Sequence, residues 1–181
     1  MLGIVFTEFM ELVEEKFSPE ILDDILDNTD LDSEGVYTSV GYYNHHDMIK
    51  MVVALSKRVD VPVDDLIEAF GEHLFTVLIS NYPMLAGESD STLDFLETVD
   101  SSIHREVIKL YPQAELPEFK CERISDTQLQ MYYRSKRPFS RLALGLMKGC
   151  ARHYGEELQV ESESSTSGDK YLTNFEIQLI K

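Results

Sequence analysis

Hydrophobic residues recur at helical spacing through the first 111 positions of the chain. Between Gly3 and about Phe17 they recur every three or four positions, which predicts an amphipathic helix. The expected helices span 3–17, 19–26, 45–58, 62–81 and 92–111. The last of these is interrupted in its pattern by the polar residues at 100–102. Ser18 and Asn44 are good N-terminal capping residues for the second and third of these helices. Pro112 ends the last one.

The hydrophobic period changes to two after Pro117. Leu129, Met131 and Tyr133 alternate with more polar neighbours, which is typical of a strand with one buried face. The expected strands span 119–124, 128–133, 157–162 and 171–180, with a helix over 138–154 and a turn over 164–169. Short connections favour antiparallel pairing. Helices followed by strands around one helix predict an α+β fold, in a single domain over 1–181.

The chain is strongly acidic, which limits its partners and location. Its 181 residues include 33 acidic and 16 basic side chains, giving a formal net charge of −17. Such a charge repels phosphate and anionic lipid, so we expect neither nucleic acid nor a membrane as partner, whereas a basic protein face remains possible. The segment 1–9 lacks the features of a signal peptide. Two cysteines, Cys121 and Cys150, are too few for a disulfide framework and suit the cytoplasm.

One of the five histidines lies on an apolar helical stripe. His104 shares this face with Leu96, Val107 and Tyr111. The pattern allows two interpretations, of which a hydrogen-bonded core histidine is the commoner and a metal ligand the other. As a ligand, a neutral imidazole would suit haem iron. His73 is the rival ligand, although its simpler interpretation is a side chain that faces away from the core.

A second constellation lies just before Pro138. Tyr133, Ser135 and Arg137 alternate along the chain, so an extended conformation points all three to one face. Pro138 favours an extended Arg137, which predicts that the strand persists to the end of this motif. A phenol, a hydroxyl and a guanidinium form a cluster of donors for carboxylates or phosphate. The alternative is an ordinary strand with a solvated, charged end.

The two constellations together resemble a known family. A Tyr-x-Ser-x-Arg motif about thirty residues after a helical histidine, and followed by a helix, resembles the haem-propionate clamp of the H-NOX (haem nitric oxide/oxygen binding) family. That family includes stand-alone bacterial sensors and the haem domain of soluble guanylate cyclase. The resemblance covers essentially the whole chain. It extends to the segments 1–5, 68–72 and 144–149, and to Pro117, where the family has a proline packed against the haem.

The resemblance implies a fold, a cofactor and roles for particular residues. A helical N-terminal (distal) half would pack on a C-terminal half with a twisted antiparallel sheet and helices, with ferrous haem b between them. His104 would be the axial ligand of the iron, and Pro117 would pack against the haem. Tyr133, Ser135 and Arg137 would hold the anionic propionates, which suits the two-point binding of a carboxylate by a guanidinium.

The resemblance also implies which gas is bound. The distal pocket maps to six apolar residues, namely Val5, Phe9, Leu74, Leu78, Leu142 and Leu146. Family members that hold oxygen stably place a tyrosine donor at the position of Leu142, whereas nitric oxide binds ferrous iron without such help. The implied function is therefore a nitric oxide sensor that excludes oxygen. Ordinary core packing would use the same six residue types.

Signalling would follow the family. Nitric oxide would break the bond between iron and His104, the helix would shift, and a separate effector would read the change. By analogy the effector is a sensor histidine kinase of two-component signalling or a cyclic-dinucleotide protein, either a diguanylate cyclase or a phosphodiesterase. The sequence shows no catalytic constellation of its own, so we expect no enzyme.

Other interpretations stay open or are weaker. The principal alternative is a haem-free adaptor whose acidic surface binds a basic partner, and haem content distinguishes it. A peroxidase-like enzyme would need polar distal residues, which the expected pocket lacks. The segment 30–35 imitates the start of a calcium loop, but Gly41 replaces its final glutamate. His45 and His46 are adjacent and are not expected to face each other on a helix.

Overall fold

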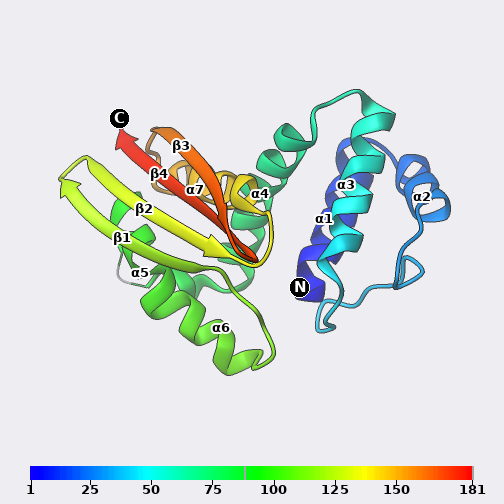
Figure 1. Ribbon diagram of the computed structural model, residues 1–181, viewed down its shortest axis with the longest axis horizontal. Helices are drawn as coiled ribbons and strands as arrows, with labels where there is room; N and C mark the ends of the chain where they lie inside the picture. The colour runs from blue at the N-terminus through cyan, green and yellow to red at the C-terminus, as the bar shows by residue number, and fades with distance from the viewer. Residues whose placement is uncertain (88, 181) are drawn as a thin grey trace.

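Four helices form the N-terminal part of the computed structural model, which describes residues 1–87 and 89–180. These are α1 (Gly3–Lys16), α2 (Pro19–Asn28), α3 (His45–Val59) and α4 (Val63–Asn81). Ser18 accepts a hydrogen bond from the Ile21 amide and Asn44 accepts one from the His46 amide, so both predicted caps are confirmed. In Figure 1, α1, α2 and α3 lie together, and α4 leads from them toward the sheet.

The C-terminal part is an antiparallel sheet with helices. Before the strands come η1 (Pro83–Ala86), α5 (Thr92–Thr98), the π-helical turn η2 (Val99–Ile103) and α6 (His104–Leu110). Then follow β1 (Glu118–Ser125), β2 (Gln128–Ser135), α7 (Ser140–Tyr154), β3 (Leu158–Ser167) and β4 (Lys170–Leu179). The strands pair antiparallel in the order β1-β2-β4-β3, and α7 covers one face of the sheet (Figure 1). The predicted α+β fold is confirmed.

Two expected elements end or break earlier than the sequence indicates. The strand β2 ends at Ser135, so the prediction that it persists to Arg137 is wrong. The chain bends at 136–137 because Pro138, which has no N–H for a ladder, leads directly into α7. The helix expected over 92–111 is divided by the wider turn η2, which separates α5 from α6.

The hairpin between β3 and β4 is longer than expected. The predicted turn over 164–169 shrinks to Gly168 and Asp169, and β3 continues to Ser167. Gly168 has a φ of +61°, a left-handed conformation that glycine adopts without steric cost and that tight hairpin turns require. The polar composition of this segment indicates its exposure, but β3 still pairs with β4 along its whole length.

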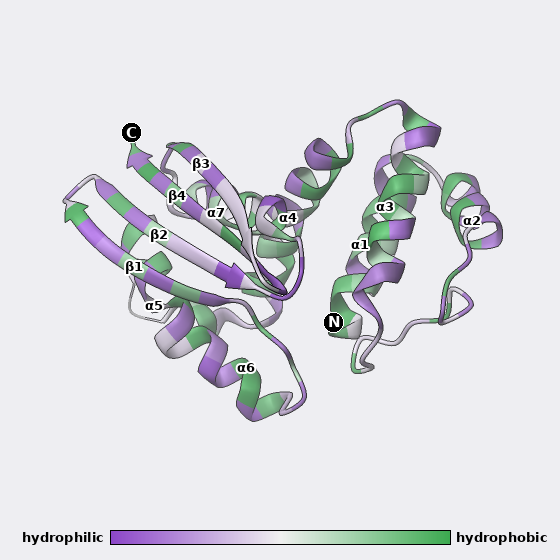
Figure 2. Ribbon diagram, in the orientation of Figure 1, coloured by the Kyte–Doolittle hydropathy of each residue, from purple (hydrophilic) through white to green (hydrophobic). Residues whose placement is uncertain are grey.

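Two hydrophobic cores fill the molecule, and α4 contributes to both. The helical core includes Phe6, Phe9, Met51, Leu55 and Phe70. The second core, between the sheet and the helices α5 and α7, includes Phe75, Met131, Met147, Phe175 and Ile177. Figure 2 shows hydrophobic and hydrophilic residues interspersed along β1, β2 and β4, as expected for a sheet covered on one face. The α4 helix therefore joins the two halves.

Glycines allow α4 and α7 to pack at very short range. A Cβ atom on Gly145 would lie 2.1 Å from the Glu68 carbonyl oxygen and 2.8 Å from the Cα of Gly71. Ion pairs join the same helices beside this contact, from Lys148 to Glu68 and from Arg152 to Glu72. The backbones thus touch at the glycines, and the charged side chains fix the register at the surface.

A buried carboxylate organises the polar connection before α3. Asp47 is 0% exposed and accepts hydrogen bonds from the amides of Asp32 (2.9 Å) and Ser33 (3.2 Å) and from the Tyr37 hydroxyl (3.0 Å). Burial alone would raise the pKa of Asp47, but these donors outweigh it and hold the pKa below its ordinary value. The loop that imitates a calcium site is held by this carboxylate.

We expect Gly145→Ala to lower the free energy of unfolding by about 1–3 kcal/mol, because the added methyl group overlaps the α4 backbone. Urea denaturation measures the change. Thr76→Ala, at an exposed position of α4, is the control and should shift stability by no more than about 0.5 kcal/mol. Equal stability of Gly145→Ala and the wild type would contradict this packing.

We expect Asp47→Asn to cost roughly 3 kcal/mol at neutral pH, because the amide places its NH₂ group against donors. The lowered pKa means that the stabilisation is complete above about pH 4 and is lost as the pH falls through the folded-state pKa. The difference in the free energy of unfolding between Asp47→Asn and the wild type should therefore narrow in acid. Urea titrations at neutral pH and in acid measure this difference. The exposed Asp27→Asn is the control. A gap that widens in acid would refute the assignment.

Candidate functional site

A largely apolar cavity lies between the N-terminal helices and the sheet. Its volume is about 280 Å³, and its walls come from α1, α4, α5, η2, α6, β1, β2, α7 and the segment 114–117. Among the described residues that line it, five have polar side chains, namely His104, Glu115, Tyr133, Ser135 and Arg137. The structure thus brings both constellations of the sequence analysis into one cavity.

His104 is the first residue of α6 and lines this cavity. Its side chain is 16% exposed, and its ring centroid lies 5.7 Å from that of Phe119. Burial lowers the pKa of the His104 imidazole, while Asp100 and the backbone of Pro117 oppose the shift. The lowered pKa favours the neutral ring, which is the form that binds metal ions.

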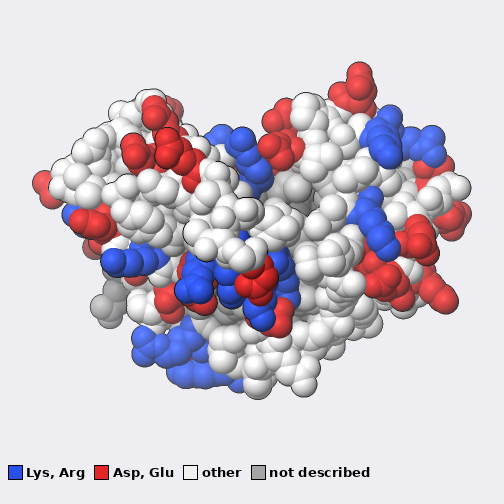
Figure 3. Space-filling model, in the orientation of Figure 1, with Lys and Arg blue, Asp and Glu red and all other residues white. Residues whose placement is uncertain are grey.

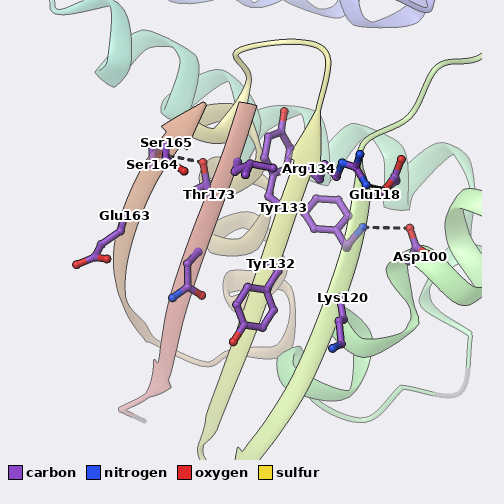
Figure 4. Close-up of a pocket in the computed structure, with 13 residues that line it drawn as sticks. Asp100, Glu118, Lys120, Tyr132, Tyr133, Arg134, Glu163, Ser164, Ser165 and Thr173 are labelled. Atoms are coloured by element: carbon purple, nitrogen blue, oxygen red, sulfur yellow. Dashed lines mark hydrogen bonds and ion pairs between the residues drawn. The ribbon is translucent and has the colours of Figure 1, made fainter. Parts of the chain in front are cut away.

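A carboxylate that the sequence analysis did not single out faces His104. The Oδ1 atom of Asp100 lies 3.7 Å from His104 Nδ1 and accepts a hydrogen bond of 3.1 Å from the Phe119 amide (Figure 4). Within residues 1–87 and 89–180, buried Nδ1 has no hydrogen-bond partner. A carboxylate beside one ring nitrogen is typical of metal-binding histidines, because it orients the ring. The sequence signal that could have revealed Asp100 is its spacing of four residues from His104, which places two side chains on the same face of a helix.

Backbone and side-chain hydrogen bonds hold the second constellation together. The hydroxyl of Tyr133, a residue that is 3% exposed, donates to the Arg137 carbonyl oxygen at 3.0 Å. The Arg137 amide donates to Ser135 Oγ, also at 3.0 Å. Burial raises the pKa of Tyr133, so its phenol keeps the proton that it donates. The three residues therefore act as one unit although Arg137 lies beyond the end of β2.

The guanidinium of Arg137 is paired with Glu115. Its Nη1 donates to the Glu115 carbonyl oxygen at 2.9 Å, and its Nη2 donates to Glu115 Oε2 at 2.6 Å. The Arg137 side chain is 15% exposed, whereas that of Glu115 is 66% exposed. Glu115, which unlike Asp100 lines the cavity, is a second residue that the sequence analysis missed, because no spacing rule links it to Arg137.

Most residues mapped to the distal pocket do line the cavity. These are Val5, Leu74, Leu78, Leu142 and Leu146, and Pro117 lines the cavity as well. Phe9 is placed differently. Its ring is 2% exposed, lies 5.3 Å from the Phe70 ring in an edge-on arrangement, and belongs to the helical core behind the cavity wall.

The other histidines lie outside this cavity. His73, the rival ligand, is not among the residues that line the cavity. The rings of His45 and His46 lie 4.2 Å apart, so the expectation that they would not face each other is wrong. They meet because His46 turns back to Asn44, whose Oδ1 lies 2.9 Å from its Nδ1. Among the described residues, no group of three His, Cys, Asp or Glu side chains could hold a metal ion.

A second hollow lies on the uncovered face of the sheet (Figure 4). Its volume is about 620 Å³, and its lining mixes acidic and basic side chains from the strands. Glu118 and Arg134 form an ion pair across it at 3.5 Å. This hollow is lined largely by side chains of the strands, whereas the first cavity gathers an imidazole and a donor cluster between apolar walls. We therefore take the first cavity as the functional site.

Comparison with known proteins places the chain in a family. The family model described as "Haem-NO-binding" matches residues 2–162. The crystal structure of the Fe(II) unliganded H-NOX protein from K. algicida shares 37% identity, with a TM-score of 0.92 over 100% of this chain and 97% of that chain. The H-NOX from Shewanella woodyi, solved with bound IWP-051 in the Fe(II)CO state, shares 44% identity, with a TM-score of 0.80 over 97% and 93%.

Curated relatives are longer proteins. Soluble guanylate cyclase gcy-35 of Caenorhabditis elegans is 23% identical over 99% of this chain but only 27% of its own length. Soluble guanylate cyclase gcy-37 of the same organism is 24% identical over 84% of this chain and 22% of its own length. This chain thus spans about a quarter of these relatives. The family match and the fold agree, and the chain belongs to the haem-NO-binding (H-NOX) family of haem gas-sensor domains.

Proposed function

We propose that residues 1–181 form one haem-based sensor domain. It would bind ferrous haem b through His104, take up nitric oxide, exclude oxygen and signal to a separate effector without catalysis of its own. The observation that carries this proposal is the convergence of a buried imidazole and the Tyr133–Ser135–Arg137 unit on one apolar cavity. The family match supports haem as the cofactor.

The residues of the cavity fit a haem. Apolar walls suit its macrocycle, and the donor cluster suits its two propionates. His104 Nδ1 is buried beside Asp100, which leaves the opposite ring nitrogen for a metal. Arg137 would bind one propionate and Ser135 would add a hydroxyl donor. Tyr133 would add a second one when its hydroxyl turns from the Arg137 carbonyl oxygen to the propionate, and Pro117 would pack against the macrocycle. When bound, the haem would supply a ferrous iron able to bind a diatomic gas.

The apolar residues of the cavity would determine which gas is held. Val5, Leu74, Leu78, Leu142 and Leu146 offer no hydrogen-bond donor. Bound oxygen carries partial negative charge and needs such a donor to be held stably, whereas nitric oxide does not. The aliphatic lining therefore supports selectivity for nitric oxide.

His104 would couple the gas to the rest of the molecule. The residue stands where η2 meets α6, and Asp100 in η2 contacts both His104 and β1. Because His104 would hold the haem, a change in that hold would let this segment shift, a local event that biases a two-state element. The effector would be a sensor histidine kinase of two-component signalling or a cyclic-dinucleotide protein, either a diguanylate cyclase or a phosphodiesterase.

The acidic surface supports a protein effector rather than nucleic acid or a membrane. Figure 3 shows acidic side chains scattered over both halves of this face and basic ones at its centre, lower left and upper right, and the sequence has 33 acidic residues against 16 basic ones. No helix in the described part of the chain has the length and hydropathy of a membrane span. We propose a cytoplasmic location, supported by the unpaired thiols of Cys121 and Cys150.

The first measurement is an absorption spectrum of the reduced protein. We expect His104→Gly to lower haem retention by roughly tenfold or more, and added imidazole to restore it, because the substitution removes the iron ligand. His73→Ala, a histidine outside the cavity, is the matched control. A wild-type protein that takes up no haem would discard the sensor and favour the haem-free adaptor that binds a basic partner.

The same variant tests signalling. We expect nitric oxide to speed amide hydrogen exchange in α6 of the wild type but not in His104→Gly supplied with imidazole, because the gas then releases a ligand that is not attached to the helix. Mass spectrometry of peptides across η2 and α6 gives the readout. Equal responses in both proteins would refute coupling through His104.

Leu142→Tyr tests gas selectivity. The wild type should show no stable oxygen complex in air, and the variant should gain oxygen binding because the phenol adds a donor to the aliphatic lining. Absorption spectra in air and under nitric oxide report both gases, and nitric oxide binding should persist. Leu142→Phe, which adds a ring without a hydroxyl, is the control. Unchanged oxygen binding in Leu142→Tyr would show that Leu142 does not face the gas.

A further inference from the structure

Glu115 presents two hydrogen-bond acceptors to the Arg137 guanidinium. The proposed function assigns the same guanidinium to a carboxylate of the cofactor. Its carbonyl oxygen and its Oε2 take one N–H each from Nη1 and Nη2 of Arg137, at 2.9 and 2.6 Å. Both side chains line the cavity. A carboxylate from a ligand would approach the same fork of donors, because this paired geometry is the one in which a guanidinium binds carboxylates best.

The two partners differ in how firmly they are held. The Arg137 backbone is fixed on both sides, since its amide donates to Ser135 and its carbonyl accepts from Tyr133. Glu115 lies between α6 and β1, outside any helix or strand, and its side chain is 66% exposed. Glu115 itself loses little by moving into water, whereas the largely buried Arg137 guanidinium needs another anion in its place. Arg137 stays in place and Glu115 is the mobile member.

The charges around the pair of Arg137 and Glu115 support an exchange of Glu115 for a ligand carboxylate. Burial lowers the pKa of His45, the charges of His46 and Arg137 lower it further, and Glu115 opposes them. His45 thus lies within range of both members of the pair, and its ring packs near that of Phe139 at the cavity wall. Without the Glu115 carboxylate, the local charge would be more positive and would attract anions.

We propose that Glu115 is an internal counter-ion of Arg137 that competes with the carboxylates of the cofactor and so limits how tightly the cavity holds a porphyrin. This inference rests on the proposed function. Because Glu115 and Pro117 belong to one short connection, displacement of Glu115 would also move the chain next to the residue proposed to pack on the haem. The opposite role, in which Glu115 only positions Arg137, predicts weaker rather than tighter binding when the carboxylate is removed.

The test uses protoporphyrin IX, which has the two propionates but no iron, so His104 ligation does not enter. We expect Glu115→Gln to bind it about three- to tenfold more tightly than the wild type in a fluorescence titration, because a competing negative charge is lost. Glu118→Gln is the matched control. It removes the same negative charge at a position three residues further along the chain, where Glu118 forms an exposed ion pair with Arg134. It should bind like the wild type.

The dimethyl ester of protoporphyrin IX isolates the charge. Its propionates are neutral, so Glu115→Gln and the wild type should bind it equally. Weaker protoporphyrin binding by Glu115→Gln, or binding equal to that of Glu118→Gln, would overturn the inference. Urea denaturation of each variant excludes misfolding as the cause. A wild type that binds neither porphyrin nor haem would instead contradict the proposed function, so the two failures are distinguishable.

Discussion

The contact between α4 and α7 is the constraint on which the rest of the structure depends. Gly71 and Gly145 allow the two backbones to touch, and no larger residue fits at either position without displacement. One helix extends from the N-terminal helices, and the other covers the sheet. Their contact therefore fixes how far apart the two hydrophobic cores stand. The cavity lies between these cores and is lined in part by α4 and α7, so their packing positions two of its walls.

Within that frame, the polar groups of the cavity are few and each has a defined neighbour. His104 faces Asp100, and Arg137 is bonded to Tyr133, Ser135 and Glu115. Apolar walls lower the local dielectric, which strengthens these interactions and makes an unpaired charge costly. The arrangement thus suits a ligand with an apolar body and anionic ends, and it leaves the imidazole as the group for a metal.

Much of the fold and part of the site could be predicted from the sequence. Local signals were sufficient to predict the helices, since Ser18 and Asn44 cap where expected. They were also sufficient to predict the alternating burial of side chains along β2. Tyr133, Ser135 and Arg137 were found because period two is a property of a single strand. Glu115 could not be found, because its pairing with Arg137 joins a loop to a distant bend. Phe9 packs against Phe70 behind the lining of the cavity, a difference that the sequence could not reveal because both environments use the same apolar residue.

The segment 99–117 concentrates polar groups of which the sequence analysis singled out only His104. It carries His104, the carboxylate beside it, the carboxylate on Arg137, and Pro117. Its one helix, α6, is short and largely exposed, and η2 widens the preceding turn. A segment with few buried side chains moves at lower cost than the α4–α7 contact. A change at His104 would therefore move this segment first, while the two cores keep the shape of the cavity.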